Sequence, residues 1–217
     1  MSEKKERVVI VDDHPLFRER LCELINHELD MEVCGEAEDA QQAIEIIRST
    51  SPELAIVDIT LKGSSGLELI KNIRALPTGV PVLVLSMHDE SLYAERALRA
   101  GASGYITKNE SAENVLLAIR RVLAGEVYLS GTLTSVFLKG LSAGLKATSQ
   151  PLDRLTDREL EILELIGRGR ATRQIAEALQ LGVATVDTYR ARIKEKMNFR
   201  TGTELQHFAI RWVRDRE

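Results

Sequence analysis

The sequence predicts an α/β domain, built on a doubly wound parallel sheet of five strands, followed by an all-α domain of four helices. The first domain is predicted by short, β-branched apolar runs that alternate with segments of helical periodicity. The second is predicted because every segment from Leu152 onward has helical spacing. A stretch rich in Ser, Thr, Gly and Leu separates them. We therefore expect domains at residues 1–125 and 151–217, joined by a linker at residues 126–150.

The first domain contains five strand–helix units. The expected strands cover residues 7–11, 31–37, 54–59, 81–86 and 104–107. The expected helices cover residues 15–28, 39–49, 65–75, 90–100 and 110–124. Strands separated by helices of this length form a parallel sheet that is covered on both faces. In such a sheet, ligands bind at the carboxyl ends of the strands.

Chemically active side chains follow four of these strands. Asp12 and Asp13 end the first strand, Asp58 ends the third, Ser86 ends the fourth and Lys108 follows the fifth. Each residue alone has an ordinary explanation as a turn, cap or surface residue, but the combination is specific. Three carboxylates at one edge need a neutralising cation, and oxygen ligands select a hard ion such as Mg²⁺. One carboxylate could also attack a phosphoryl group and form an aspartyl phosphate.

The segments VVIVDDHP, LAIVDITL, VLVLSMHDE and GYITK resemble the receiver domain of two-component response regulators. The resemblance implies a flavodoxin-like fold and makes Asp58 the phospho-acceptor. It also implies that Asp13 and Asp58 bind Mg²⁺ directly, with help from Asp12 and the backbone carbonyl of Thr60. Lys108 would contact the phosphoryl group.

The same resemblance implies a switch pair, in which Ser86 moves toward the phosphoryl group and Tyr105 turns inward. Two positions depart from the commonest receiver pattern. Lys62-Gly63 stands where Pro-Gly is usual, which adds a positive charge near the pocket. Met87 follows Ser86 where smaller residues are frequent, so we expect it to narrow water access and lengthen the lifetime of the phosphoryl group.

The second domain begins with a capping box formed by Thr156 and Glu159. Its helices are expected to start after Thr156 and to cover about residues 172–179, 183–197 and 201–213. In the third helix, one apolar side faces the core, and the opposite side carries small residues with basic flanks. That surface suits entry into a DNA major groove, although spacing alone leaves open a helical bundle with solvated arginines.

The segment from LTDRELEIL to KEKM is similar to the LuxR-type helix-turn-helix, and its combination with a receiver resembles the NarL/FixJ type of response regulator. The resemblance implies that residues 183–197 form the recognition helix. It implies base-reading positions at Asp187, Thr188 and Ala191. It implies phosphate contacts at Arg173, Thr185, Arg190, Arg192 and Lys194. The last helix would pair two subunits as a homodimer on two DNA half-sites about one helical turn apart.

Asp187 stands where lysine is frequent in such helices. A carboxylate cannot hold phosphate, but it can accept a hydrogen bond from a cytosine amine. An inward ion pair with Arg190 or Arg173 is the other explanation, and both stay open at this point. Gly182 replaces the usual serine N-cap, which weakens helix capping by only a few tenths of a kcal/mol.

Charge is distributed unevenly along the chain. Residues 1–125 carry 14 basic and 21 acidic side chains, whereas residues 168–200 carry eight basic and three acidic ones. An acidic first domain and a basic segment in the second predict different partners. The N-terminal apolar run is too short for a signal peptide or a membrane span, so we expect a cytoplasmic protein. Cys22 and Cys34 lack metal-site spacing and are expected to be buried thiols.

Together these features predict a DNA-binding response regulator rather than an enzyme. A sensor histidine kinase would phosphorylate Asp58, and this would control dimerisation and promoter binding. A haloacid-type phosphatase is a rival from another class, but it needs a second aspartate two residues after the nucleophile, where this chain has Thr60. An interaction module that works without phosphate is a second rival, against which the complete acidic pocket argues.

Overall fold

The computed structural model describes residues 4–61, 64–87, 90–131, 134 and 151–215. The chain divides into two compact units that meet within residues 135–150, which lie outside the described part. The sequence also favours a short helix around residues 133–141 of the linker, and nearly all of this segment falls outside the described residues. Each unit is described by itself below.

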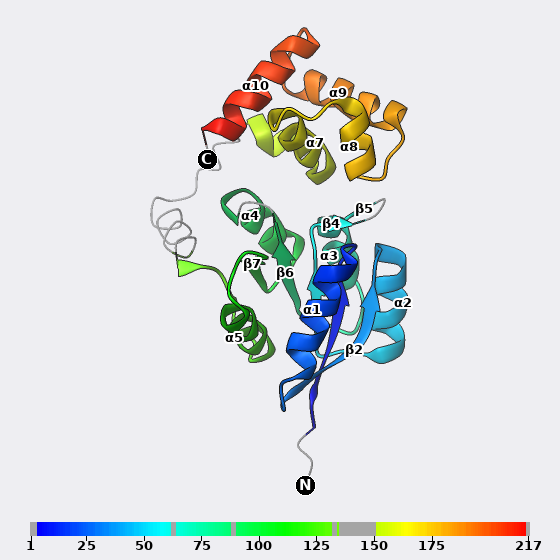
Figure 1. The fold of residues 1–217 in the computed structure, drawn as a ribbon, viewed down its shortest axis with the longest axis vertical. Coiled ribbons are helices and arrows are strands. Elements are labelled where there is room, and N and C mark those ends of the chain that lie inside the picture. The colour runs from blue at the N-terminus through cyan, green and yellow to red at the C-terminus, as the bar shows by residue number, and fades with distance from the viewer. Residues whose placement is uncertain (1–3, 62–63, 88–89, 132–133, 135–150, 216–217) are drawn as a thin grey trace. The chain divides into compact units, whose positions relative to one another are not determined.

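The first unit is built on a five-stranded sheet in which neighbouring strands run parallel (Figure 1). The strand order is β2-β1-β3-β6-β7, which confirms the predicted doubly wound topology. The strands are β1 (Glu6–Val11), β2 (Met31–Ala37), β3 (Leu54–Val57), β6 (Val82–Ser86) and β7 (Gly104–Thr107). β-branched and leucine side chains dominate these strands because both faces of the sheet are covered.

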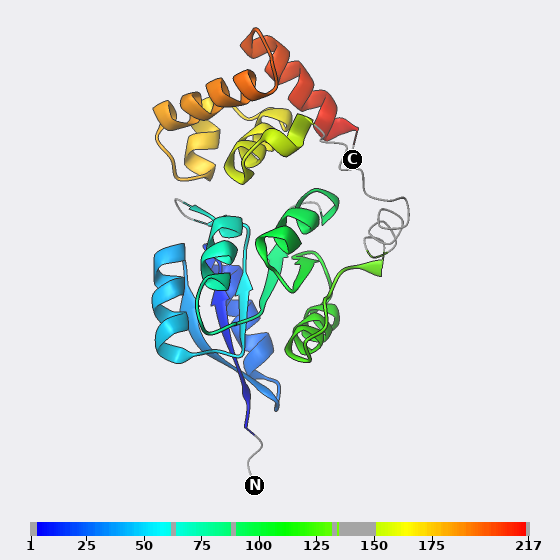
Figure 2. The same cartoon turned by 180° about the vertical axis from the view of Figure 1, so that it is seen from behind.

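Among the described residues, five helices cover the sheet, two on one face and three on the other (Figures 1 and 2). They are α1 (Pro15–Asn26), α2 (Ala40–Thr50), α3 (Gly66–Arg74), α4 (Glu90–Ala100) and α5 (Ala112–Leu123). α1 and α5 share one hydrophobic cluster with alternate residues of the strands, and α2, α3 and α4 lie on the opposite face. The carboxyl ends of the strands remain clear of both layers, and this edge holds the site described below.

A short hairpin that the sequence analysis did not predict follows β3. It pairs β4 (Thr60–Leu61) with β5 (Ser64–Ser65) and returns the chain toward the end of β3. The Gly66 amide then donates to the Ile59 carbonyl at 2.6 Å. A side chain at Gly66 would overlap the Asp58 carbonyl, so glycine is required where α3 approaches the β3 terminus.

The first residues of the predicted linker belong to the first unit. The Tyr105 amide donates to the Tyr128 carbonyl at 2.9 Å, and the Tyr128 amide donates to the Ser103 carbonyl at 3.1 Å. A side chain at Gly104 would lie only 2.9 Å from the Tyr128 carbonyl oxygen, so glycine permits this close approach. Tyr128 therefore covers the outer edge of β7, and the ordered part of this unit extends past residue 125.

The second unit is helical, as predicted. It comprises a 3₁₀ turn η1 (Pro151–Arg154) followed by α7 (Asp157–Gly167), α8 (Thr172–Ala178), α9 (Val183–Lys196) and α10 (Gly202–Arg214). The predicted capping box is present, with the Thr156 amide donating to Glu159 Oε2 at 2.7 Å. Gly167 ends α7 and also lies against Ala209 and Val213 of α10, where a side chain would not fit.

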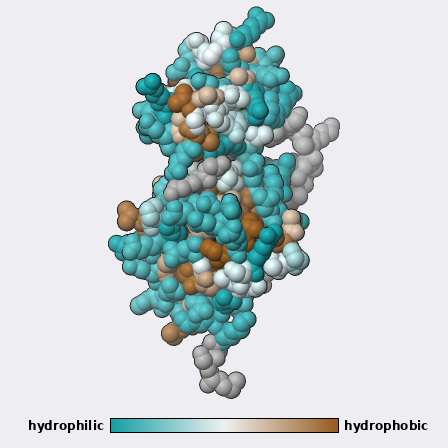
Figure 3. Space-filling view, turned by 90° about the vertical axis from the view of Figure 1, so that its right-hand side faces the viewer, coloured by the Kyte–Doolittle hydropathy of each residue, from teal (hydrophilic) through white to brown (hydrophobic). Residues whose placement is uncertain are grey.

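The large hydrophobic side chains that are exposed among the described residues are Leu16, Leu29, Met87, Leu117, Val127, Val183 and Ile210. The face drawn in Figure 3 is mainly hydrophilic, with hydrophobic residues in small separate groups. No helix among the described residues has both the length and the apolar character needed to span a bilayer. Cys22 and Cys34 are free and partly buried, and burial, reinforced by Glu36, raises the pKa of the Cys22 thiol to about 12.

Candidate functional site

The predicted acidic residues meet at the carboxyl edge of the sheet. Asp12 follows β1, Asp58 follows β3 and Lys108 follows β7, and the parallel topology brings these three ends together. Asp12 and Asp58 are each only 3 % exposed. The Asp58 amide donates to the Val11 carbonyl at 2.9 Å, which continues the β1–β3 pairing up to the site. The sheet itself therefore sets the spacing of the two buried carboxylates.

Lys108 bridges these carboxylates. Its Nζ lies 2.6 Å from Asp12 Oδ2 and 2.7 Å from Asp58 Oδ2, and its side chain is 2 % exposed. The Lys108 amide donates to the Ser86 carbonyl at 2.8 Å, which fixes the start of the side chain beside β6. Charges removed from water in this way are tolerated only when they are paired, so the three groups form one interdependent set.

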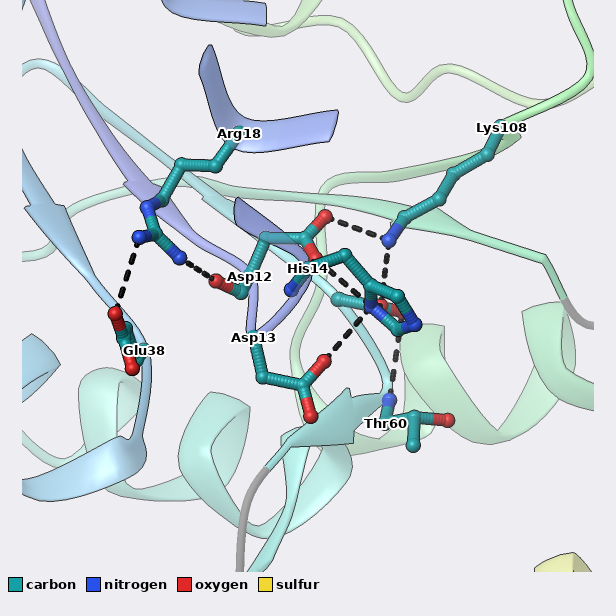
Figure 4. A network of polar contacts seen from close by, with 8 residues as sticks. Asp12, Asp13, His14, Arg18, Glu38, Thr60 and Lys108 are labelled. Atoms are coloured by element: carbon teal, nitrogen blue, oxygen red, sulfur yellow. Dashed lines mark hydrogen bonds and ion pairs between the residues drawn. The ribbon is translucent and has the colours of Figure 1, made fainter. Parts of the chain in front are cut away.

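His14 lies over the same carboxylates, a position that the sequence analysis did not assign (Figure 4). Its Nδ1 is 2.8 Å from Asp13 Oδ1, 3.2 Å from Asp12 Oδ1 and 3.8 Å from Asp58 Oδ2. The His14 amide also donates to Asp12 Oδ1 at 2.9 Å. The sequence feature that could have identified His14 is its position directly after the two aspartates, in the turn that leads into α1.

Arg18 is a second residue that the sequence analysis missed. Its Nη1 donates to the Asp12 backbone carbonyl at 2.6 Å, and its Nη2 lies 3.2 Å from Glu38 (Figure 4). Its Nε lies 3.2 Å from Glu36. Its side chain is 13 % exposed. Arg18, one helical turn beyond His14, thus connects the backbone of the pocket to the end of β2 and to the residue that follows it.

The donor set fits a hard divalent cation. One ligand atom each from Asp12, Asp13, His14 and Asp58 lies within 4.8 Å of all the others. Three of the four groups are carboxylates, the ligand type that Mg²⁺ prefers. His14 Nδ1 lies within 3.8 Å of an oxygen of each of the three carboxylates, so their negative charges are concentrated around this position. The Thr60 amide lies 3.4 Å from Asp58 Oδ1, and the role of its carbonyl stays a prediction.

The predicted switch residues lie on neighbouring strands. Ser86 ends β6, Tyr105 lies in β7, and both side chains are fully buried. Tyr105 therefore has the inward position that the sequence analysis associated with the phosphorylated state. The movement of either residue stays a prediction. Met87, the next residue along, is 60 % exposed at the rim of this edge. Lys62 and Gly63 lie outside the described residues.

In the second unit, α9 presents the surface predicted for DNA. The predicted core side of this helix comprises Val186, Ile193 and Met197; the first two are fully buried, and Met197 is partly buried at the C-cap. Of the eight predicted contact residues, six are exposed, and Arg190 and Lys194 are partly buried. The exposed six are Arg173, Thr185, Asp187, Thr188, Ala191 and Arg192. These six side chains are available to a partner, and their contacts with DNA stay predictions.

Asp187 is exposed, and among the residues that the structure describes no ion pair joins it to Arg190 or Arg173. The inward alternative considered from the sequence is therefore not the arrangement seen. The Thr188 hydroxyl donates to the Ala184 carbonyl at 2.9 Å, which leaves its oxygen as an acceptor. Asp187 and Thr188 thus both offer acceptor oxygens on the outer surface of α9.

An ion pair fixes the end of α9 against the start of α7. Lys196 Nζ lies 2.6 Å from Glu159 Oε2, and Glu159 is 1 % exposed. Burial alone opposes the charge of Glu159, but donors from Lys196 and Thr156 outweigh it and hold the pKa of this carboxyl below its ordinary range. Arg158 supports the same region, pairing with Glu161 at 2.7 Å and donating to the Leu179 carbonyl at 3.0 Å.

Comparison with known proteins matches both units to described families. The family described as "Response regulator receiver domain" matches residues 8–120. The family described as "Bacterial regulatory proteins, luxR family" matches residues 153–209. These two matches cover the acidic pocket and helices α7 to α9 respectively.

The oxygen regulatory protein NreC of Staphylococcus aureus (strain bovine RF122 / ET3-1) is 35 % identical over 94 % of this chain and 97 % of its own length. A LuxR-family two-component response regulator from Aurantimonas sp. SI85-9A1 is 36 % identical, with a TM-score of 0.58 over 61 % of this chain and 94 % of that one. The response regulator ChrA of a heme-sensing two-component system is 28 % identical, with a TM-score of 0.52 over 97 % of this chain and 98 % of that one. The chain therefore belongs to the two-component response regulators, transcription regulators that join a receiver domain to a LuxR-type DNA-binding domain.

Proposed function

We propose that Asp58 accepts a phosphoryl group from a sensor histidine kinase and that this controls promoter binding by α9. The observation that carries the proposal is the buried pairing of Asp58 with Lys108 at 2.7 Å, beside two further carboxylates. A buried aspartate held at the open edge of a sheet, with an ammonium group beside it, is arranged for nucleophilic attack on phosphorus.

In the proposed transfer, an Asp58 carboxylate oxygen forms a bond to phosphorus as the bond between phosphorus and the kinase histidine nitrogen breaks. The electron pair of the broken bond returns to that histidine. Lys108 is placed to move its hydrogen bond from the Asp58 carboxylate to a phosphoryl oxygen, which offsets the added negative charge. The Thr60 amide, 3.4 Å from Asp58 Oδ1, helps to orient the carboxylate.

Asp13 and Asp58 would hold Mg²⁺ directly, with Asp12 and the Thr60 carbonyl assisting. When bound, the ion supplies charge neutralisation for the phosphoryl oxygens. Lys108 already neutralises part of the charge on Asp12 and Asp58, since it contacts both. The chain thus contributes the Lys108 ammonium as one cation, and a set of carboxylates that would bind Mg²⁺ as a second.

At the output end, α9 would enter the major groove, with Asp187, Thr188 and Ala191 toward the base edges. Basic residues at its flanks would hold phosphates and fix its register. We expect α10 to pair two copies of the chain, so that a homodimer reads two half-sites about one helical turn apart. The exposed side chains of α9 and the net positive charge of residues 168–200 support this part of the proposal.

Acetyl phosphate and Mg²⁺ provide a direct test on the full chain. Asp58→Asn should abolish acid-stable, hydroxylamine-labile phosphorylation, and it should remove the phosphorylation-dependent gain in promoter binding. Asp215→Asn, which removes an exposed carboxylate outside the pocket, is the matched control and should keep both properties. Labelling that persists at full level in Asp58→Asn would contradict the assignment. Selection of genomic fragments with and without acetyl phosphate would then identify the operator.

A further inference from the structure

The ammonium of Lys108 has a third neighbour besides its two carboxylates. Its Nζ lies 4.4 Å from the centroid of the Phe17 ring, in the first turn of α1. A cation this close to an aromatic face is attracted by the negative potential of the ring. Lys108 is therefore held on one side by Asp12 and Asp58 and on another by an aromatic surface.

Phe17 and Lys108 also share a surface cavity. A cavity of about 270 Å³ lies between α1 and α5, and both Phe17 and Lys108 line it. The rest of its wall is largely apolar and includes Leu21, Leu24 and Val115. The Lys108 side chain is only 2 % exposed although it lines this cavity, and the Phe17 ring lies over its ammonium group.

Lysine needs such support more than most residues. Its charge sits on four flexible methylene groups, and its three donors rotate freely unless neighbours restrict them. In the proposed transfer, the Asp58 contact passes to the phosphoryl group, so the carboxylates alone would hold the ammonium less firmly during the reaction. The Phe17 ring makes no hydrogen bond with the ammonium, so phosphoryl transfer does not require this contact to be exchanged.

We propose that Phe17 is a positioning residue for phosphoryl transfer, acting through Lys108. The ring holds the ammonium in line with Asp58 while the hydrogen bond passes from carboxylate to phosphoryl oxygen. This inference rests on the proposed role of Asp58. A purely structural role for Phe17 is the competing explanation, because its side chain also packs against the hydrophobic cluster of α1 and α5.

The test compares Phe17→Leu, which keeps apolar volume without the ring, with Phe17→Tyr, which keeps the ring. In the full chain with saturating Mg²⁺ and acetyl phosphate, Phe17→Leu should slow labelling of Asp58 by roughly 3- to 30-fold. Phe17→Tyr should restore the rate to within about two-fold of the parent chain, because phenol and benzene rings attract cations similarly. Leu24→Ala, which alters the same cavity away from the ammonium, should leave the rate within about two-fold.

A double-mutant cycle separates positioning from structure. Phe17→Leu should have little further effect when Lys108 is already alanine, because the ring then has no ammonium to hold. An undiminished effect in the Lys108→Ala background, or a Phe17→Tyr rate as low as that of Phe17→Leu, would overturn the inference. Urea denaturation of each variant gives the fraction folded, and Phe17→Met serves if the leucine variant unfolds. Absence of labelling on Asp58 in the parent chain would instead contradict the proposed function.

Discussion

At the scale of single residues, the position of Asp58 depends on a neighbour that has no side chain. Gly66 lies against the Asp58 carbonyl, and an added methyl group would overlap backbone atoms that cannot move independently. Gly66→Ala should therefore lower the free energy of unfolding of the first unit by about 2–3 kcal/mol and slow phosphorylation. Gly131→Ala is the control, because nothing lies within 4 Å of its added methyl group. Equal stability of the two variants in urea denaturation would show that the backbone relaxes freely.

A second prediction at the scale of single residues concerns Met87. Its side chain is 60 % exposed at the rim of the strand edge that holds Asp58. If it restricts water near the phosphoryl group, Met87→Ala should speed dephosphorylation several-fold without changing the labelling rate. Loss of acyl phosphate from purified protein measures this directly. An unchanged rate of loss would mean that the exposed side chain does not shield the site.

Sequence reasoning identified the buried polar residues of the pocket but not the residues around them. Asp12, Asp58 and Lys108 were predictable because strand topology alone brings their backbones to one edge. Phe17 and Arg18 were not, because their contacts depend on side-chain rotamers in the first turns of α1. Helical spacing places such residues on a face of the helix without indicating which atoms they reach.

At the scale of elements, the junction of α7 and α9 makes the second unit sensitive to pH. The pKa of Glu159 is lowered in the folded state, so its charge stabilises the fold above the ordinary glutamate range, and this stabilisation is lost as the pH falls through the folded pKa. The urea concentration at the unfolding midpoint of this unit should therefore decrease as the pH is lowered below the ordinary glutamate pKa. Trp212 in α10, the only tryptophan of the chain, reports on this unit through its fluorescence.

Glu159→Gln is the control for this pH dependence. Glutamine can keep the capping box, since it also accepts from the Thr156 amide, but it has no charge to lose. Its midpoint should be lower at neutral pH, because Lys196 loses its partner, and should change less with acid. A profile as steep as that of the parent chain would assign the acid sensitivity to other carboxyl groups.

The two sides of α9 should respond differently to substitution. Asp187 is exposed on the outer surface, so Asp187→Ala should relax discrimination at one base pair by about 1–3 kcal/mol.

Arg192, whose guanidinium carbon lies 5.9 Å from the Tyr189 ring centroid, belongs to the basic flank. Arg192→Ala should weaken binding to all sequences alike and reduce the salt dependence. Binding measured on single-base variants of the operator at two salt concentrations separates these outcomes.

At the scale of the whole molecule, hydrophobic periodicity predicted every major strand and helix of the described part. It missed the β4–β5 hairpin because two-residue strands have no measurable period. It also placed Tyr128 in a linker, since composition cannot show that a backbone segment pairs with a sheet. Both omissions concern backbone hydrogen bonds between segments, which depend on tertiary structure rather than on local sequence.

The pairing of Tyr128 with β7 has a consequence for chimeric regulators built from this receiver. A graft whose junction falls at residue 125 would discard Tyr128 and leave the β7 edge with bare amide and carbonyl groups, a template for unwanted strand addition. A junction after residue 131 would retain Tyr128 and its hydrogen bonds to the edge of β7. Light scattering should detect aggregates in chimeras joined at residue 125 and none in chimeras joined after residue 131. The receiver module suited to such grafts therefore includes Tyr128, whose backbone pairs with the outermost strand, β7.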